Sequence, residues 1–178
     1  LLLPAAWLVL CIGTCFFGEL EYMAINIGVF NPCSLVGDRL ADVSLAFKGI
    51  AVLSCPGTKQ RQVASQPFRV TSTECHTAVK WGWGKGKCTN KSAGVSILLD
   101  KKRVRKADIR RVHVPPAELQ GRLGAITVCM GQRTLVIIVA YFPPRTTVAL
   151  SVLRWRETNT AMLTWIRSVL DEAPDRAT

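Results

Sequence analysis

One strand end in the sequence offers a place for chemistry without supplying an acidic ligand. Residues 50–61 read IAVLSCPGTKQR, in which an apolar run stops at Cys55-Pro56-Gly57. The run predicts a short buried strand, and the Pro-Gly pair predicts a turn at its end. In α/β proteins, ligands and metals are commonly held at the ends of buried strands. This strand end has a backbone turn and no carboxylate, which raises the question of what it could hold.

A second stretch combines the residue types that suit binding of a nucleic-acid strand. Trp81, Trp83, Lys85 and Lys87 lie within seven residues and are separated by glycines. Tryptophan rings stack on bases, and lysines neutralise phosphates. The alternative is a hairpin whose tryptophans pack on the core beneath a solvated lysine tip, since residues two apart in a strand share a face. The sequence leaves both alternatives open.

The charge of the chain favours a polyanionic partner. Its 178 residues include 23 basic and 12 acidic side chains, which gives a net charge of +11. Such a balance favours nucleic acid, DNA or RNA, or an anionic membrane surface, and a basic but inert surface is the alternative. Basic residues are densest in KKRVRKADIRR (101–111). This segment predicts an edge strand that is either solvated or in contact with DNA.

The cysteines argue against a disulfide scaffold or a zinc site. The chain has seven of them, with no Cys-x-x-Cys pair, and Cys75-His76 has no matching pair at zinc spacing. We therefore expect free thiols in a reducing compartment, and an intracellular protein that is nuclear or cytoplasmic. His76 and His113 fall within predicted strands and are expected to be structural or surface histidines.

The first eighteen residues, LLLPAAWLVLCIGTCFFG, carry no charge. Their length lies at the lower limit for a membrane span, and Pro4, Gly13 and Gly18 disfavour a helix. We expect residues 1–20 to be an apolar N-terminal extension outside the folded domain, which would then comprise residues 21–178. A membrane-tethered protein that uses residues 1–17 remains an alternative.

The elements that would position these residues form an α/β pattern. Residues 22–30 predict a strand, residues 37–50 a helix and the IAVLSC run a second strand. Six short β-like runs follow, divided by Gly, Pro, Asn and Lys, and ILL and LVIIVAYF should be central because both faces are apolar. Apolar residues at three- and four-residue spacing predict a last helix at about 149–171.

This order of segments resembles the endonuclease/exonuclease/phosphatase superfamily, in particular the endonuclease domain of LINE-type retrotransposon reading frames. The family has an Asn at the end of its first strand, matched by Asn31, and Gln-Glu-Thr at the end of the next, matched by Pro56-Gly57-Thr58. An aromatic, glycine-rich hairpin follows, here residues 81–99, and then the Gly121-Arg122 strand. IIVAYFPP (137–144) is similar to the family's Asn-Ile-Tyr-Ala-Pro.

The resemblance covers residues 22–178 and only the first half of the family's domain. It implies an α/β (α+β) fold, a partial four-layer αββα sandwich with mostly antiparallel strands. Because the second half would be missing, faces such as LVIIVAY are expected to be exposed and the chain to be poorly soluble.

The resemblance also implies a chemistry, which is Mg²⁺-dependent hydrolysis of a phosphodiester. Carried over, Asn31 and Tyr141 would be catalytic, while Gly57 falls where the family has its metal-binding Glu. Residues 1–178 also lack the family's Asp-x-Asn motif and its late Asp–His pair. We therefore expect the chain as given to be inactive, with Mg²⁺ binding in doubt and no small-molecule cofactor.

The resemblance and the basic charge together imply a nucleic-acid contact around the strand end and the hairpin. The residues expected to make it are Lys59, Arg61, Trp81, Trp83, Lys85, Lys87 and Lys91. Lys59 could place positive charge where the family holds its metal. The alternative to a nuclease fragment is a non-catalytic basic module that binds nucleic acid, which would show salt-sensitive affinity indifferent to chelation.

Overall fold

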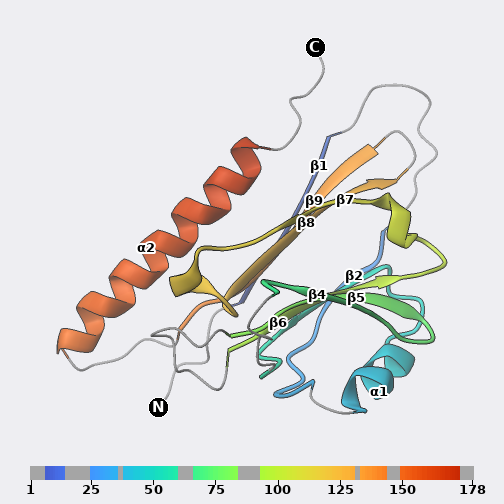
Figure 1. The fold of residues 1–178 in the computed structure, drawn as a ribbon, viewed down its shortest axis with the longest axis horizontal. Helices are drawn as coiled ribbons and strands as arrows, with labels where there is room; N and C mark the ends of the chain where they lie inside the picture. Colours follow the sequence, from blue (N-terminus) through green and yellow to red (C-terminus); the bar gives the residue numbers. More distant parts are fainter. Residues whose placement is uncertain are drawn as a thin grey trace.

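The computed structural model describes residues 7–14, 25–35, 38–59, 66–83, 93–130, 133–143 and 149–172. These residues form two β-sheets, two α-helices and two short 3-10 helices (Figure 1). The predicted mixed α/β class with mostly antiparallel strands is confirmed, because β2–β3 is the one parallel pair among the described strands.

The five-stranded sheet begins with the predicted strand–helix–strand unit. Helix α1 (Arg39–Ala46) connects β2 (Ile27–Val29) to the parallel strand β3 (Val52–Pro56), as a parallel pair requires. The remaining strands are antiparallel and give the order β2-β3-β6-β5-β4, with β4 (Arg69–Ser72), β5 (His76–Trp81) and β6 (Val95–Asp100).

The four-stranded sheet has the order β1-β9-β8-β7 and is entirely antiparallel. Its strands are β1 (Trp7–Thr14), β7 (Ile109–His113), β8 (Leu123–Met130) and β9 (Arg133–Tyr141). The 3-10 helices η1 (Lys106–Asp108) and η2 (Ala117–Leu119) flank β7, and α2 (Ala149–Asp171) follows the sheet. The bounds of α2 match the predicted 149–171.

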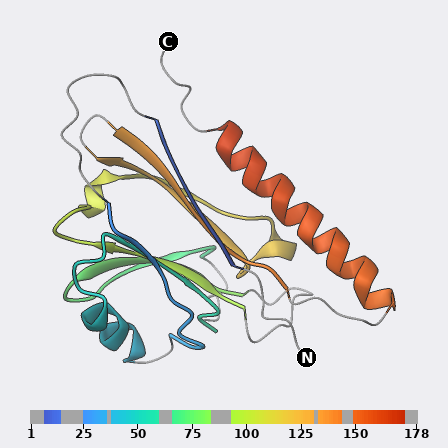
Figure 2. The ribbon, with the colours of Figure 1, turned by 180° about the vertical axis from the view of Figure 1, so that it is seen from behind.

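Three apolar clusters hold these elements in four layers. The largest lies between the sheets and joins residues of β3, β5 and β6 to residues of β8 and β9. A second cluster packs Met162, Ile166 and Val169 of α2 on the outer face of the four-stranded sheet. A third packs Leu40 of α1 on the outer face of the five-stranded sheet. The layers are therefore α2, sheet, sheet and α1, which Figures 1 and 2 show from opposite sides.

The two apolar runs occupy the central positions predicted for them. β6 lies between β3 and β5, and β9 lies between β1 and β8. Residues 136–140 of β9 are at most 3% exposed, because α2 covers one face and the other sheet covers the opposite face. The expectation that LVIIVAY would be exposed is therefore wrong. Both sheets and both helical layers lie within residues 7–172, so the described residues form a sandwich of two sheets flanked by helices.

The N-terminal apolar segment also differs from the prediction. Residues 7–14 form β1 and pair with β9 over eight residues, from Trp7 opposite Tyr141 to Thr14 opposite Thr134. The free backbone N–H and C=O groups along the edge of β9 are hydrogen-bonded when another strand pairs with it. This part of residues 1–20 therefore belongs to the sheet. No helix within the described ranges is both long and apolar enough to cross a membrane.

The basic segment 101–111 is not the continuous edge strand that the sequence predicted. Residues 101–104 form a turn, residues 106–108 form η1, and the strand β7 begins only at Ile109. The side chain of Val104 is fully buried and anchors this turn in the core. The chain at residues 101–104 is therefore not part of an extended strand. On α2, the apolar residue Leu163 is 55% exposed and does not belong to the buried face.

A tryptophan–glycine contact joins the two sheets. Trp81, at the end of β5, is 1% exposed, and its indole Nε1 donates to the carbonyl oxygen of His113 at 2.9 Å. Gly124 of β8 lies directly under the ring, since a Cβ there would overlap ring atoms of Trp81. The prediction that Trp81 stacks on bases is therefore wrong: the ring fills the space between the sheets.

Candidate functional site

Two adjacent strand ends bring Asn31 and Gly57 together. Asn31 follows β2 and Gly57 follows its parallel neighbour β3, so both leave the same edge of the sheet. A Cβ built on Gly57 would lie 2.8 Å from the side-chain oxygen Oδ1 of Asn31. This oxygen also accepts a hydrogen bond from the backbone N–H of Cys33 at 3.0 Å. The position that matches the family's metal-binding Glu is therefore next to the position that matches its first-motif Asn.

The turn after β3 has a conformation that favours glycine. Gly57 has φ +72° and Lys59 has φ +54°, both in the left-handed region. Backbone hydrogen bonds hold the turn on both sides, from Leu35 N–H to the Thr58 oxygen (2.8 Å) and from Thr58 N–H to the Gly94 oxygen (2.9 Å). Backbone hydrogen bonds thus tie the turn to the segments on both sides of it.

The same hydrogen-bonded path continues into the other sheet. The N–H of Gly94 donates to the Gly121 oxygen at 2.6 Å, and the N–H of Tyr141 donates to the Arg122 oxygen at 2.8 Å. Gly121 has φ +75°, and a Cβ on it would lie 3.0 Å from the backbone of Trp83. The start of β8 and the end of β9 therefore lie at the same end of the sandwich as Asn31 and Gly57.

Arg122 is the most unusual side chain at this end. The residue is 8% exposed, and its guanidinium Nη1 is buried without a hydrogen-bond partner among the described residues. Burying an unpaired charged donor is costly, and an anion that accepts from it removes most of that cost. The hydroxyl of Thr58 is likewise buried and unpaired within the described part of the chain. A guanidinium and a hydroxyl are each donors of the kind that bind phosphate oxygens.

The groups at this end do not fit a magnesium ion. Mg²⁺ is usually held through one or two carboxylates, and here the matching position is Gly57. The Asn31 oxygen is occupied by the Cys33 N–H, and no group of three or more His, Cys, Asp or Glu side chains comes together in the described ranges.

Thiol chemistry is also disfavoured at this strand end. Burial raises the pKa of Cys55, two residues before the turn, to about 12. The thiolate is the nucleophilic and metal-binding form, and it is therefore scarce at neutral pH.

The sequence-predicted residues fall into three groups. Asn31, Gly57 and Tyr141 lie at the same end of the sandwich, as the resemblance implied, although Tyr141 also packs on the inter-sheet cluster. Trp83 is half-buried there, and Lys59 is exposed. The others lie outside the described residues: Arg61, Lys85, Lys87 and Lys91.

Arg122 is the site residue that the sequence did not single out. Its signal was a lone basic residue between Gly121 and the apolar run LGAITVCM. A charged residue beginning a fully buried strand is ordinarily solvated at the sheet edge. Only the structure shows that its guanidinium is covered.

Both histidines have structural roles, as the sequence predicted. His76 is fully buried, and its Nδ1 lies 2.8 Å from the hydroxyl of Ser44 on α1. The His113 Nε2 lies 2.9 Å from the Thr127 hydroxyl, and burial together with Arg111 lowers the pKa of His113 despite the opposing effect of Glu172. His76 lies opposite Asp100, at the other end of the sandwich from Arg122.

No family model, curated protein or solved structure matches the chain.

Proposed function

We propose that this chain is the N-terminal part of an endonuclease/exonuclease/phosphatase-type domain from a retrotransposon-like reading frame. It keeps the phosphate-binding end of that domain, acts on DNA or RNA as a binding protein, and does not hydrolyse the phosphodiester as given. The observation that carries this proposal is the meeting of Asn31, the Gly57 turn and the buried Arg122 at one end of an αββα sandwich.

Several features support the family assignment beyond the order of motifs. The four layers and the parallel β2–β3 pair agree with the architecture that the resemblance implied. The two motif positions that should meet, at residues 31 and 57, are adjacent in space although they lie on different strands. Chance similarity of short motifs does not require this adjacency.

Binding without hydrolysis follows from the groups at this end. Phosphoryl chemistry needs charge stabilisation and an activated water, which the family obtains from a carboxylate-bound metal and an Asp–His pair. Here Gly57 replaces the carboxylate. The Arg122 guanidinium can still donate hydrogen bonds to a phosphate oxygen, since charge-assisted hydrogen bonds to phosphate need no metal.

A nicking assay combined with a binding assay tests the proposal. We expect no Mg²⁺-dependent nicking of supercoiled plasmid, and an affinity for a DNA duplex that falls with salt and is unchanged by EDTA. Tyr141→Phe should leave both results unchanged, because a protein that only binds DNA does not use the Tyr141 phenol for catalysis. Nicking that requires Mg²⁺ and is lost in Tyr141→Phe would overturn the proposal in favour of an active nuclease.

A further inference from the structure

The second concentration of charge lies far from Arg122. Residues 101–111 contain seven basic side chains and one acidic one, a net charge of +6 out of +11 for the whole chain. All seven basic residues are exposed. The charge of this protein is therefore concentrated in one segment, which we call the basic loop (residues 101–111).

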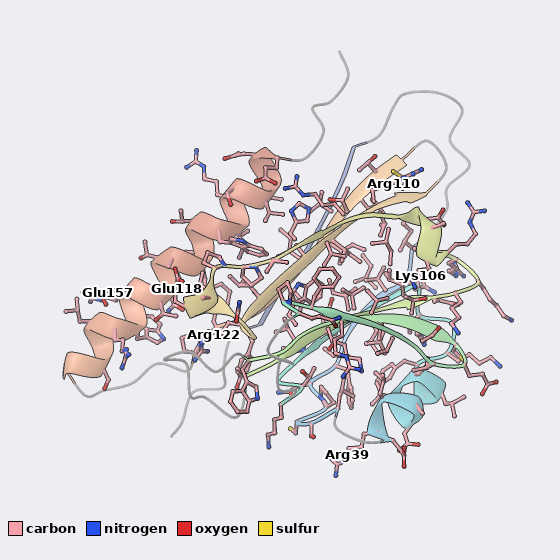
Figure 3. All side chains as sticks on the ribbon, in the orientation of Figure 1. Arg39, Lys106, Arg110, Glu118, Arg122 and Glu157 are labelled. Atoms are coloured by element: carbon pink, nitrogen blue, oxygen red, sulfur yellow. The ribbon has the colours of Figure 1, made fainter. Side chains whose placement is uncertain are left out.

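The basic loop lies at the opposite end of the sandwich. Figure 3 shows Lys106 and Arg110 on one side of the molecule and Arg122 on the other. β8 begins directly after Arg122, and its residue Val128 lies opposite Ile109 at the start of β7. Six residues of extended strand correspond to about 20 Å, so one phosphate cannot contact both places.

The loop backbone is held rigidly by groups that face inward. Asp100 is 5% exposed, and its side chain accepts from the Lys102 N–H at 2.9 Å, while its backbone oxygen accepts from the Val104 N–H at 2.8 Å. Asp108 accepts from both the backbone N–H and the guanidinium of Arg105, each at 2.9 Å. A preorganised surface of this kind loses little backbone entropy when it binds.

At least three of the loop's cations make no ion pair with a carboxylate among the described residues. Among the described residues, Arg105 pairs with Asp108 and Arg111 pairs with Glu172. Lys102, Lys106 and Arg110 have no carboxylate oxygen within 4.0 Å in the described part of the chain. Like charges held close together on a rigid loop repel one another, and a polyanion relieves that repulsion.

Protection of a sheet edge explains only part of this charge. β7 is an edge strand, and a bulge between Ile109 and Arg111 leaves Arg110 without a partner residue on β8. Charged residues and bulges at an edge prevent pairing with other chains. That purpose accounts for Arg110 and Arg111, but Lys102 and Lys106 lie in the turn and in η1, outside any strand.

We infer that the basic loop is a second phosphate-backbone contact, which binds nucleic acid without reading its sequence. Backbone contacts of this type come from clustered Lys and Arg and carry no base specificity. A membrane surface fits less well, because membrane-binding segments add apolar side chains to basic ones. None of the large apolar side chains exposed in the described residues falls within 101–111.

The test is the affinity of the full chain for a mixed-sequence 25-base-pair DNA duplex, measured by fluorescence anisotropy over a range of NaCl. The loop variant is Lys102→Gln/Lys106→Gln/Arg110→Gln. The matched control is Arg39→Gln/Lys48→Gln/Arg156→Gln, which removes the same charge from exposed positions elsewhere. We expect the loop variant to bind about 30-fold or more weakly at 0.1 M NaCl, with a salt slope lower by roughly 2 to 3. The control should lose only about 3-fold, from net charge alone.

Two outcomes would overturn the inference. Equal losses in the two triple variants would show that only net charge matters, and an unchanged affinity in the loop variant would show that the loop does not contact DNA. In the second case, binding to phosphatidylserine vesicles is measured as well. If vesicle binding depends on the loop and DNA binding does not, the partner of the loop is a membrane surface and not a nucleic acid. Arg122 is intact in both triple variants, so these outcomes leave the proposed function at the other end untouched.

Discussion

Gly124→Ala is expected to destabilise the protein by about 3 kcal/mol and to separate the two sheets locally. A Cβ at residue 124 would overlap ring atoms of Trp81 and lie 2.8 Å from Cε2. The ring cannot move aside easily, because Trp81 is 1% exposed and its Nε1 is bound to the His113 oxygen. Chemical denaturation monitored by tryptophan fluorescence measures the effect.

The control for this prediction is Gly28→Ala. Gly28 also lies in a strand, β2, and a Cβ there would be 3.1 Å from Cδ1 of Leu53, the end of a flexible side chain. We expect it to cost less than about 1 kcal/mol. If Gly124→Ala were as stable as Gly28→Ala, the contact between Trp81 and β8 would not have the geometry described above.

Gly57→Glu, which places a carboxylate at the position matched by resemblance to a metal-binding Glu, is expected to destabilise the fold and to create no Mg²⁺ site. The left-handed φ of +72° costs any other residue about 1 kcal/mol. The new Cβ would also lie 2.8 Å from the Asn31 Oδ1, which is held by the Cys33 N–H. Denaturation and Mg²⁺ titration by calorimetry measure the two effects.

A series of alanine variants separates strain from contact. Gly49 has φ +91° and nothing within 4 Å of a built Cβ, so Gly49→Ala reports the backbone strain alone. Gly57→Ala should cost about 1 kcal/mol more than Gly49→Ala, and Asn31→Ala in the same chain should remove most of that excess. Equal costs for the two glycines, or a Gly57→Glu variant that binds Mg²⁺ and stays stable, would disprove the close approach of residues 31 and 57.

The sequence predicted the elements well because most of them carry a local pattern. The run LVIIVAYF is apolar on both faces, which is possible only for a strand covered on both sides, and β9 is such a strand. The spacing of Met162, Ile166 and Val169 predicted the buried face of α2 in the same way. The sequence did not predict the adjacency of residues 31 and 57, which depends on the parallel pairing of β2 with β3.

The errors concern features that depend on distant partners. Residues 7–14 look like a detached apolar segment because the strand they pair with, β9, lies more than a hundred residues later. Trp81 and Trp83 have the same local composition, and only the position of Gly124 on β8 decides that Trp81 is buried. The basic loop resembles a strand in composition, but Asp108 accepts the backbone N–H of Arg105 and so favours a 3-10 turn.

We propose that the guanidinium of Arg122 binds the phosphate backbone without a metal. The most direct test of this proposal is the affinity for the same DNA duplex in EDTA, compared between Arg122→Gln and Arg154→Gln, a control that removes one exposed charge from α2. We expect a folded Arg122→Gln to bind about 10-fold or more weakly, with partial recovery in Arg122→Lys, while Arg154→Gln is almost unchanged. Equal affinities for the two glutamine variants would contradict it.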